Sequence, residues 1–229
     1  MTKDNENDND KSANGHEEQQ QQQQSTTTAA ASASLQSQDA VVKLAPFNPT
    51  CQQAQQTAIG LFQLDSNDSL FDLGCGDGRF LIEAASRVQG LTCVGVEMDP
   101  VFCRRAQERL GAIEANDDDS AAVSLSLADR VNIVEGDALD EELLFRHGFN
   151  EATAIFVYLL PKGLRLVRPL IERISGRSGK GNDANDTRSH RKVRVVSYMF
   201  SIKGWEPVCI DRTTRGECAL YLYESGKSW

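Results

Sequence analysis

The segment that most constrains the fold is a run of alternating glycines that follows a short apolar stretch. Residues 70–80 read Leu-Phe-Asp-Leu-Gly-Cys-Gly-Asp-Gly-Arg-Phe, and a stretch of helical character continues to Val88. This order predicts a strand, a tight turn and the first turn of a helix. Glycine suits such a turn because the backbone takes unusual dihedral angles and a ligand can approach without meeting a Cβ. The N–H groups of the turn and the helix dipole favour an anionic ligand group, which predicts a nucleotide-like cofactor.

The spacing of the glycines narrows the choice of cofactor. A dinucleotide-binding turn has the pattern Gly-x-Gly-x-x-Gly. Here Gly74, Gly76 and Gly78 alternate strictly, and Arg79 takes the place of the third dinucleotide glycine. An acid, Asp72, lies within the strand, two residues before the first glycine. A plain strand-to-helix turn remains the alternative for a glycine triplet considered by itself.

Two further acids follow at the ends of later predicted strands. A short apolar strand over 92–97 ends in Glu97, about twenty residues past the glycine turn, where an acid can accept both ribose hydroxyls. The alternative for Glu97 alone is a solvated strand-end carboxylate. A third strand, 131–135, is followed by Gly-Asp-Ala at residues 136–138.

In this order and spacing, the three elements resemble the class I S-adenosylmethionine-dependent methyltransferases. The resemblance implies that S-adenosyl-L-methionine is the cofactor. It implies that Asp72 positions the cofactor's amino group, that the glycines admit its methionine portion and that Glu97 binds the ribose. Asp137 and Ala138 would bind the adenine, with the acid accepting from the exocyclic amine. The residues predicted to bind the cofactor are Pro49, Thr50, Asp72, Gly74, Cys75, Gly76, Gly78, Glu97, Met98, Asp137, Ala138 and Tyr158.

A segment before the glycine turn indicates a subgroup. Residues 45–50, Ala-Pro-Phe-Asn-Pro-Thr, resemble the aromatic-x-Pro-Thr element of the lysine methyltransferases of the ATP synthase c-subunit and the adenine nucleotide translocase, with their prokaryotic relatives. The resemblance covers about residues 44–225. Asn48 departs from it, because the group more often has an apolar residue there, and so does Tyr-Met-Phe at 198–200. The alternative for Asn48 or Thr50 is a helix N-cap.

The end of the fourth predicted strand bears on the acceptor of the methyl group. The sequence there is Val-Tyr-Leu-Leu-Pro over 157–161, without the Asn or Asp that enzymes acting on amide or base nitrogens place beside the acceptor. A deprotonated lysine amine needs less help, so we expect transfer to protein lysine. Tyr158 and Trp205 are the candidate walls of the acceptor pocket, and a core role is the alternative for each. A small-molecule methyltransferase and a non-catalytic cofactor-binding domain remain open as other functions.

The alternation of elements predicts the fold class. It is α/β, a Rossmann-like doubly wound sheet that is mostly parallel and ends in an antiparallel hairpin. The predicted helices cover 49–63, 79–88, 100–110, 140–146 and 161–174. The predicted strands cover 70–74, 92–97, 131–135, 153–159, 192–200, 207–213 and 217–224.

Composition divides the chain into a tail, 1–40, and a methyltransferase domain, 41–229. The tail has a run of six glutamines and almost no apolar side chains, so we expect it to be disordered. It contributes −5 of the net charge of −9, and the mild remaining charge predicts no nucleic-acid partner. Polar insertions are expected at about 114–121 and 176–191.

The cysteine and histidine content and the N-terminal composition predict the state of the thiols, the absence of a metal site and the cellular location. Six cysteines without a Cys-x-x-Cys pair, and three scattered histidines, predict buried free thiols and no metal site. No stretch is apolar for long enough to predict a transmembrane segment. The acidic N-terminus predicts a cytoplasmic protein without a mitochondrial presequence, although the resemblance allows a mitochondrial location. The sequence leaves the oligomeric state open.

Overall fold

The computed structural model describes residues 48–114, 126–177, 192–214 and 216–229. These residues form a seven-stranded sheet in the order β3-β2-β1-β4-β5-β7-β6. β1 to β5 run parallel, and β7 pairs antiparallel with both β5 and β6, which confirms the predicted fold class. The strands are β1 (Ser69–Leu73), β2 (Thr92–Glu97), β3 (Val131–Glu135), β4 (Ala154–Val157), β5 (Arg194–Tyr198), β6 (Cys209–Asp211) and β7 (Leu220–Glu224).

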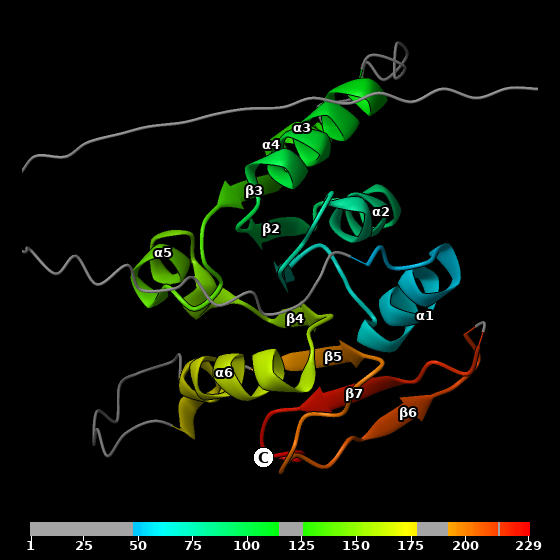
Figure 1. Cartoon of the computed structure of the whole chain (residues 1–229), viewed down its shortest axis with the longest axis vertical. Helices are drawn as coiled ribbons and strands as arrows, with labels where there is room; N and C mark the ends of the chain where they lie inside the picture. Colours follow the sequence, from blue (N-terminus) through cyan, green and yellow to red (C-terminus); the bar gives the residue numbers. More distant parts are fainter. Residues whose placement is uncertain (1–47, 115–125, 178–191, 215) are drawn as a thin grey trace, which may run out of the picture. The chain divides into compact units, whose positions relative to one another are not determined.

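Helices cover both faces of the sheet (Figure 1). The helices α1, α2 and α3 lie on one face, and α5 and α6 lie on the other. The helical segments are α1 (Gln52–Phe62), α2 (Arg79–Arg87), α3 (Pro100–Glu114), α4 (Leu127–Arg130), α5 (Glu141–Arg146), η1 (Phe149–Glu151), α6 (Pro161–Glu172) and η2 (Arg173–Arg177).

The prediction missed two short helical segments. α4 is a single turn that begins with a capping box: the Ser126 hydroxyl accepts from the Asp129 N–H at 3.2 Å, and Asp129 accepts from the Ser126 N–H at 3.1 Å. The three-residue η1 precedes β4. Neither segment is long enough to show a helical period in sequence, so only the capping signal of α4 could have been found.

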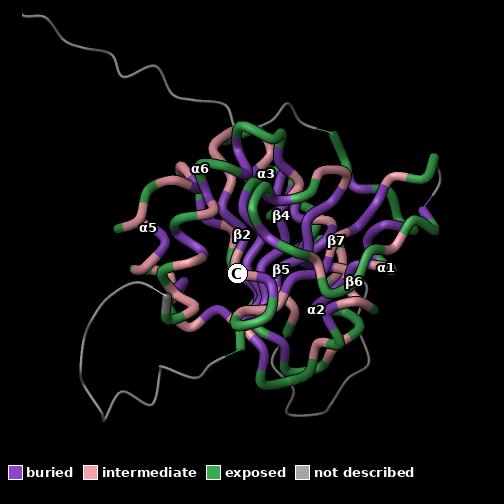
Figure 2. Tube along the Cα trace, turned by 90° about the horizontal axis from the view of Figure 1, so that it is seen from below, coloured by how far each residue is buried: buried purple, intermediate pink, exposed green. Residues whose placement is uncertain are grey.

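Two apolar cores lie on the two faces of the sheet. One contains Phe71 and Leu73 of β1, packed with residues of α6 and η1. The other contains Leu70 of β1, packed with residues of α1 and α2. Figure 2 shows the buried trace concentrated in the strands between the helices. Because side chains alternate along a strand, Asp72 shares the face of Leu70 and lies beneath α1 and α2.

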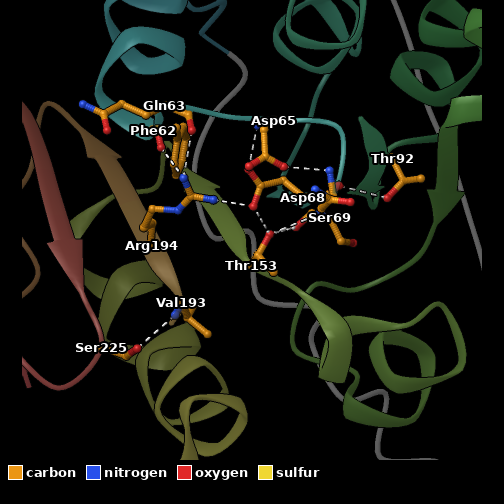
Figure 3. Close-up of polar contacts among 11 residues, drawn as sticks. Phe62, Gln63, Asp65, Asp68, Ser69, Thr92, Thr153, Val193, Arg194 and Ser225 are labelled. Carbon is orange, nitrogen blue, oxygen red and sulfur yellow. Dashed lines mark hydrogen bonds and ion pairs between the residues drawn. The ribbon is translucent and has the colours of Figure 1, made fainter. Parts of the chain in front are cut away.

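A polar cluster centred on Arg194 joins α1 to three strands (Figure 3). The guanidinium donates to the carbonyl oxygens of Phe62 and Gln63 at the C-terminal end of α1, and to the carboxylate of Asp68. Thr153 donates to the same carboxylate at 2.6 Å. A cation at a helix C-terminus also interacts favourably with the helix dipole.

This cluster sets the ionisation of Asp68. Burial alone would raise the pKa of Asp68, but hydrogen bonds from Thr153 and Arg194 outweigh it and hold the pKa below its usual value. A carboxyl group with a depressed pKa stabilises the fold at pH values above its unfolded pKa. That contribution is lost as the pH falls through the folded-state pKa.

All six cysteines lie within the described part of the chain and are free thiols. Cys75, Cys93 and Cys103 are buried, as expected, but Cys51 and Cys209 are exposed, contrary to the prediction. The predicted tail 1–40 and most of both predicted insertions lie outside the described residues. Among the residues that are described, no helix is both long and apolar enough to cross a membrane.

We predict that Arg194→Met lowers the free energy of unfolding by about 3 kcal/mol, because it leaves Asp68 charged and buried without its cation. Denaturant unfolding at pH 7 measures this change. The matched control is Arg87→Met, which removes an exposed ion pair with Glu83 and should change the free energy by about 0.5 kcal/mol or less. Equal effects of the two substitutions would contradict the account. The effect of Arg194→Met should shrink as the pH falls below the usual pKa of an aspartate, and it should be lost once the pH passes the lowered pKa of Asp68.

Candidate functional site

A cavity of about 370 Å³ lies at the carboxyl edge of the parallel strands. Its walls include the residues that directly follow β1, β2 and β4. The strand order reverses between β1 and β4, and open α/β sheets bind ligands at such a switch point. The cavity therefore stands where the fold class places a cofactor, within the usual size range of ligand pockets, roughly 300–1,000 Å³.

Gly74 and Gly76 of the glycine turn line this cavity, whereas Gly78, also predicted as a site residue, does not. The backbone of the turn explains all three glycines. Gly74, Gly76 and Gly78 have φ angles of 89°, 55° and 69°. A Cβ on Gly78 would stand 2.9 Å from the Cβ of Ala106 in α3, so this position also needs glycine for space. The turn therefore combines left-handed backbone with close packing of α3.

Four N–H groups of this turn already have acceptors within the protein. Gly74 and Cys75 donate to the carbonyl of Val96 at 2.8 and 3.1 Å, and Gly78 donates to the Cys75 carbonyl at 3.0 Å. Gly76 donates to Oε2 of Glu97 at 2.9 Å. The hydrogen bonds to Val96 and Glu97 tie the turn to the end of β2. The expectation that the turn and the start of α2 bind an anionic ligand group stays a prediction, which would rest on the other N–H groups there.

Asp72 is the charged group of the cavity that most clearly lacks a partner. It lines the cavity and is only 3% exposed, and within the described residues its carboxylate accepts no hydrogen bond. Burial, together with the nearby Glu97, raises the pKa of Asp72 well above its usual value. A buried carboxyl group without a partner is costly, so this site favours a ligand that brings a positive charge or hydrogen-bond donors.

Glu97 ends β2, as predicted, and the main chain fixes its orientation. Its Oε2 accepts from Gly76 and its Oε1 accepts from the Asp99 N–H, both at 2.9 Å. Each carboxylate oxygen can accept a second hydrogen bond. Glu97 is thus held at the cavity with lone pairs that remain available to two hydroxyl groups.

The segment after β3 also reaches the cavity. Gly136 and Ala138 line it, as does Met98 after β2, and the Gly136 N–H donates to the Glu97 carbonyl at 2.8 Å. Asp137 does not line the cavity, and its Oδ1 accepts from the Leu139 N–H at 2.9 Å. Its contact with a ligand remains a prediction.

The segment before α1 covers the cavity, and Pro49 and Thr50 line it. α1 begins at Gln52, and its N-cap residue is Cys51, whose side chain makes no capping hydrogen bond. The alternative that Asn48 or Thr50 caps this helix is therefore wrong. Thr50 is buried, and its carbonyl accepts from the Gln55 side chain at 2.7 Å.

Tyr158 follows β4 and lines the cavity. Its hydroxyl accepts a hydrogen bond from Nδ2 of Asn48 at 2.7 Å and donates one to Sδ of Met199 at 2.8 Å. Asn48 lines the cavity too, although the sequence marked it only as a departure from the family pattern. Asn48 could have been identified as a cavity residue from its position next to Pro49, which was predicted to bind the cofactor.

Comparisons with known proteins agree with this geometry. No family model matches the chain. A protein-lysine N-methyltransferase of Saccharolobus islandicus (strain REY15A) is 27% identical over 184 residues, which cover 80% of this chain and 94% of that protein. An RNA methyltransferase from Salinibacter ruber, solved in complex with S-adenosyl-L-homocysteine, is 26% identical with a TM-score of 0.58, covering 80% of this chain and 96% of that one. The chain is a class I S-adenosylmethionine-dependent methyltransferase.

The fold of this methyltransferase also occurs in a more distant structure. The precorrin-6y C5,15-methyltransferase of Geobacter metallireducens GS-15 has a TM-score of 0.51 at 15% identity, over 83% of this chain and 96% of that one. This likeness supports the fold alone.

In this methyltransferase, Trp205 lies in a core and not among the residues that line the cavity. Its ring stacks on Trp229 at a centroid distance of 3.9 Å, and its Nε1 donates to Glu172 at 2.9 Å. Trp205 therefore packs the loop after β5 against α6, and the prediction that it forms a wall of the acceptor pocket is corrected. A tryptophan after a strand has no sequence signal that separates these two roles.

Several lining residues were not predicted as site residues. Phe80 and Phe156 stack at a centroid distance of 4.0 Å between α2 and β4, and both line the cavity. The others come from the segment before α1, from the glycine turn and the start of α2, from strand ends and from the start of α3. They are Asn48, Asp77, Arg79, Val96, Asp99, Pro100, Phe102, Gly136 and Leu159.

Asp77 anchors the glycine turn to two helices. It accepts from Nε and Nη2 of Arg79 at 2.8 and 2.6 Å and from Nη2 of Arg109, in α3, at 2.8 Å. Burial would raise the pKa of Asp77, but Arg79 and Arg109 hold it below its usual value. The carboxylate thus stays ionised and fixes the turn.

We predict that Asp77→Ala weakens S-adenosylmethionine binding about tenfold, since hydrogen bonds to charged groups contribute about 1.5 kcal/mol or more. Isothermal titration calorimetry measures this. The control is Glu83→Ala in α2, which removes an ion pair with Arg87 but no residue of the cavity wall. Unchanged affinity in Asp77→Ala would show that the turn does not need this anchor.

Proposed function

We propose that this methyltransferase transfers the methyl group of S-adenosylmethionine to the side-chain amine of a lysine in a protein substrate. The observation that carries the proposal is the similarity, across 94% of its length, to the protein-lysine N-methyltransferase of S. islandicus. Tyr158 at the cavity, after a strand without the Asn or Asp typical of amide- and base-methylating enzymes, supports the same acceptor.

The dimensions of the site fit the cofactor. The lining residues follow β3, β2, β1 and β4, which are neighbours in the sheet. Adjacent strands lie about 4.8 Å apart, so the site spans roughly 14 Å. This length suits a nucleoside with an amino-acid tail. The S. ruber structure, with its bound S-adenosyl-L-homocysteine, supports this assignment for the present chain.

The chemistry of the donor set fits the cofactor as well. Asp72, buried and without a hydrogen-bond partner among the described residues, would bind the amino group of the methionine portion. Glu97 would accept from the two ribose hydroxyls, and the main chain at 136–138 would contact the adenine. Asn48, Pro49 and Thr50 would cover the methionine end, opposite the adenine.

The cofactor supplies an electrophilic methyl group on a sulfonium centre. A neutral lysine amine is itself a good nucleophile, so the protein must orient the amine in line with the methyl–sulfur bond and exclude water. Burial of an amine lowers its pKa and favours the neutral form. Tyr158 stands where it can accept a hydrogen bond from the amine, and no protein base is required.

RNA is the second candidate acceptor, because the S. ruber protein is named an RNA methyltransferase. The charge of the chain weighs against it. The net charge is −9, and nucleic-acid binding depends strongly on Lys and Arg contacts to phosphate. Two further alternatives are a small-molecule acceptor and a domain that binds the cofactor without catalysis. The labelling experiment described next distinguishes both from transfer to lysine.

We predict that the protein, incubated with methyl-labelled S-adenosylmethionine and a total cell extract, labels protein. Amino-acid analysis after acid hydrolysis should recover the label as methylated lysine. Asp72→Asn keeps the shape of the side chain and removes its charge. We expect this substitution to weaken cofactor binding by about 1.5 kcal/mol or more and so to lower the rate of labelling at least tenfold.

Three results would contradict the proposal. Label recovered in RNA would favour the second candidate, and label confined to the small-molecule fraction would indicate a small-molecule acceptor. An absence of label in every fraction, despite cofactor binding by calorimetry, would indicate a non-catalytic domain. Extract treated with ribonuclease, and extract with chemically blocked lysines, are the matched controls.

A further inference from the structure

The hydroxyl of Tyr158 is held from two sides. Asn48 donates to its oxygen at 2.7 Å, and the hydroxyl donates its own proton to Sδ of Met199 at 2.8 Å. A phenol oxygen offers one proton and two lone pairs. Met199 uses the proton of the Tyr158 hydroxyl, and Asn48 uses one lone pair. One lone pair of the Tyr158 oxygen therefore remains for a ligand in the cavity.

The backbone of Met199 supports a role for its side chain. Met199 has a φ angle of 68°, in the left-handed region, and its N–H donates to the Ala219 carbonyl at 2.8 Å. This conformation costs a non-glycine residue roughly 1–2 kcal/mol, and glycine would adopt it without strain. A methionine occupies this strained position, and its sulfur accepts a hydrogen bond from a tyrosine that lines the cavity. This combination indicates that the sulfur has a function at the site.

The ionisation of Tyr158 keeps this arrangement intact. Burial raises the pKa of Tyr158, although the hydrogen bond from Asn48 opposes the change. The ring also packs against Tyr198 at a centroid distance of 4.7 Å. The phenol therefore stays neutral near pH 7, and its proton remains on the side of Met199.

We propose that Asn48 and Met199 are positioning residues that hold Tyr158 as a hydrogen-bond acceptor toward the substrate. The site then selects an acceptor group that can donate a hydrogen bond while it offers a lone pair to the methyl group, as an amine N–H does. This inference rests on the proposed lysine activity and adds the means of recognising the amine.

The arrangement favours the correct geometry of transfer. When the amine donates one N–H to Tyr158, its lone pair points away from the phenol oxygen and is available to the methyl carbon. The nitrogen–carbon bond forms as the carbon–sulfur bond breaks, the bonding electrons pass to sulfur, and the extra proton of the product ammonium leaves to water. A carboxylate or carbonyl acceptor, with lone pairs alone, is repelled by the lone pair of Tyr158.

Two substitutions at Met199 separate this role from simple packing. Met199→Leu keeps an apolar side chain and removes the sulfur, whereas Met199→Gln keeps a hydrogen-bond acceptor of similar reach. We expect Met199→Leu to lower the rate of labelling of extract lysines about fivefold, the value of one hydrogen bond, and Met199→Gln to retain most of it. Rates are measured at saturating S-adenosylmethionine, with cofactor affinity checked by calorimetry.

Asn48 and Tyr158 complete the test. Asn48 is exposed, so Asn48→Ala should leave the fold intact and also lower the rate about fivefold. In a Tyr158→Phe background, neither Asn48→Ala nor Met199→Leu should have a further effect, because both act through the hydroxyl. Tyr198→Phe is the matched control, since this tyrosine packs on Tyr158 but does not line the cavity.

The outcomes distinguish this inference from the proposed function. If the wild-type protein labels no lysine, the proposed function fails and the inference fails with it. If lysine is labelled but Met199→Leu matches the wild type and Met199→Gln is slower, Met199 only packs and the inference alone is overturned. Full effects of Asn48→Ala and Met199→Leu in the Tyr158→Phe background would also overturn it.

Discussion

The hydrogen bonds between the glycine turn and the end of β2 organise the rest of the site. Gly74 and Cys75 donate to Val96, and Gly76 donates to the carboxylate of Glu97. These bonds require the left-handed φ angles that glycine permits, and they join the ends of β1 and β2. Four donors of the turn are thus used within the protein, and the cavity presents two acids: Glu97, fixed by main-chain donors, and Asp72, which has no partner within the described residues.

Two residues that line the cavity, Asp72 and Tyr158, each have hydrogen-bonding capacity that no described residue uses. Asp72 is a buried acid that gains a partner from a cationic amino group, and Tyr158 offers one lone pair to a donor. Both features favour amine groups, one on the cofactor and one on the acceptor. The polarity of the cavity thus agrees with methyl transfer to nitrogen, because an anionic or carbonyl acceptor would offer no donor to the remaining lone pair of Tyr158.

Most of the fold and many of the residues that line the cavity could be predicted from sequence, because local patterns encode them. Apolar strands, a glycine turn and strand-end acids lie close together along the chain, and their spacing implies their position in a parallel sheet. The acceptor side could not be predicted to the same extent. Asn48, Tyr158 and Met199 are far apart in sequence and meet only after folding, whereas Trp205 has an aromatic side chain suited equally to a pocket wall and to a core.

The ionisation of Asp72 offers the most direct test of the account. Its pKa is raised in the free protein, and a positively charged cofactor should lower it, so binding should release protons at pH values near or below the raised pKa. Calorimetric titration with S-adenosylmethionine, in buffers of different ionisation enthalpy between pH 5 and 8, counts these protons. The account predicts proton release by the wild type that is absent from Asp72→Asn, together with tighter binding as the pH rises. Equal proton counts for the two proteins at every pH would contradict it.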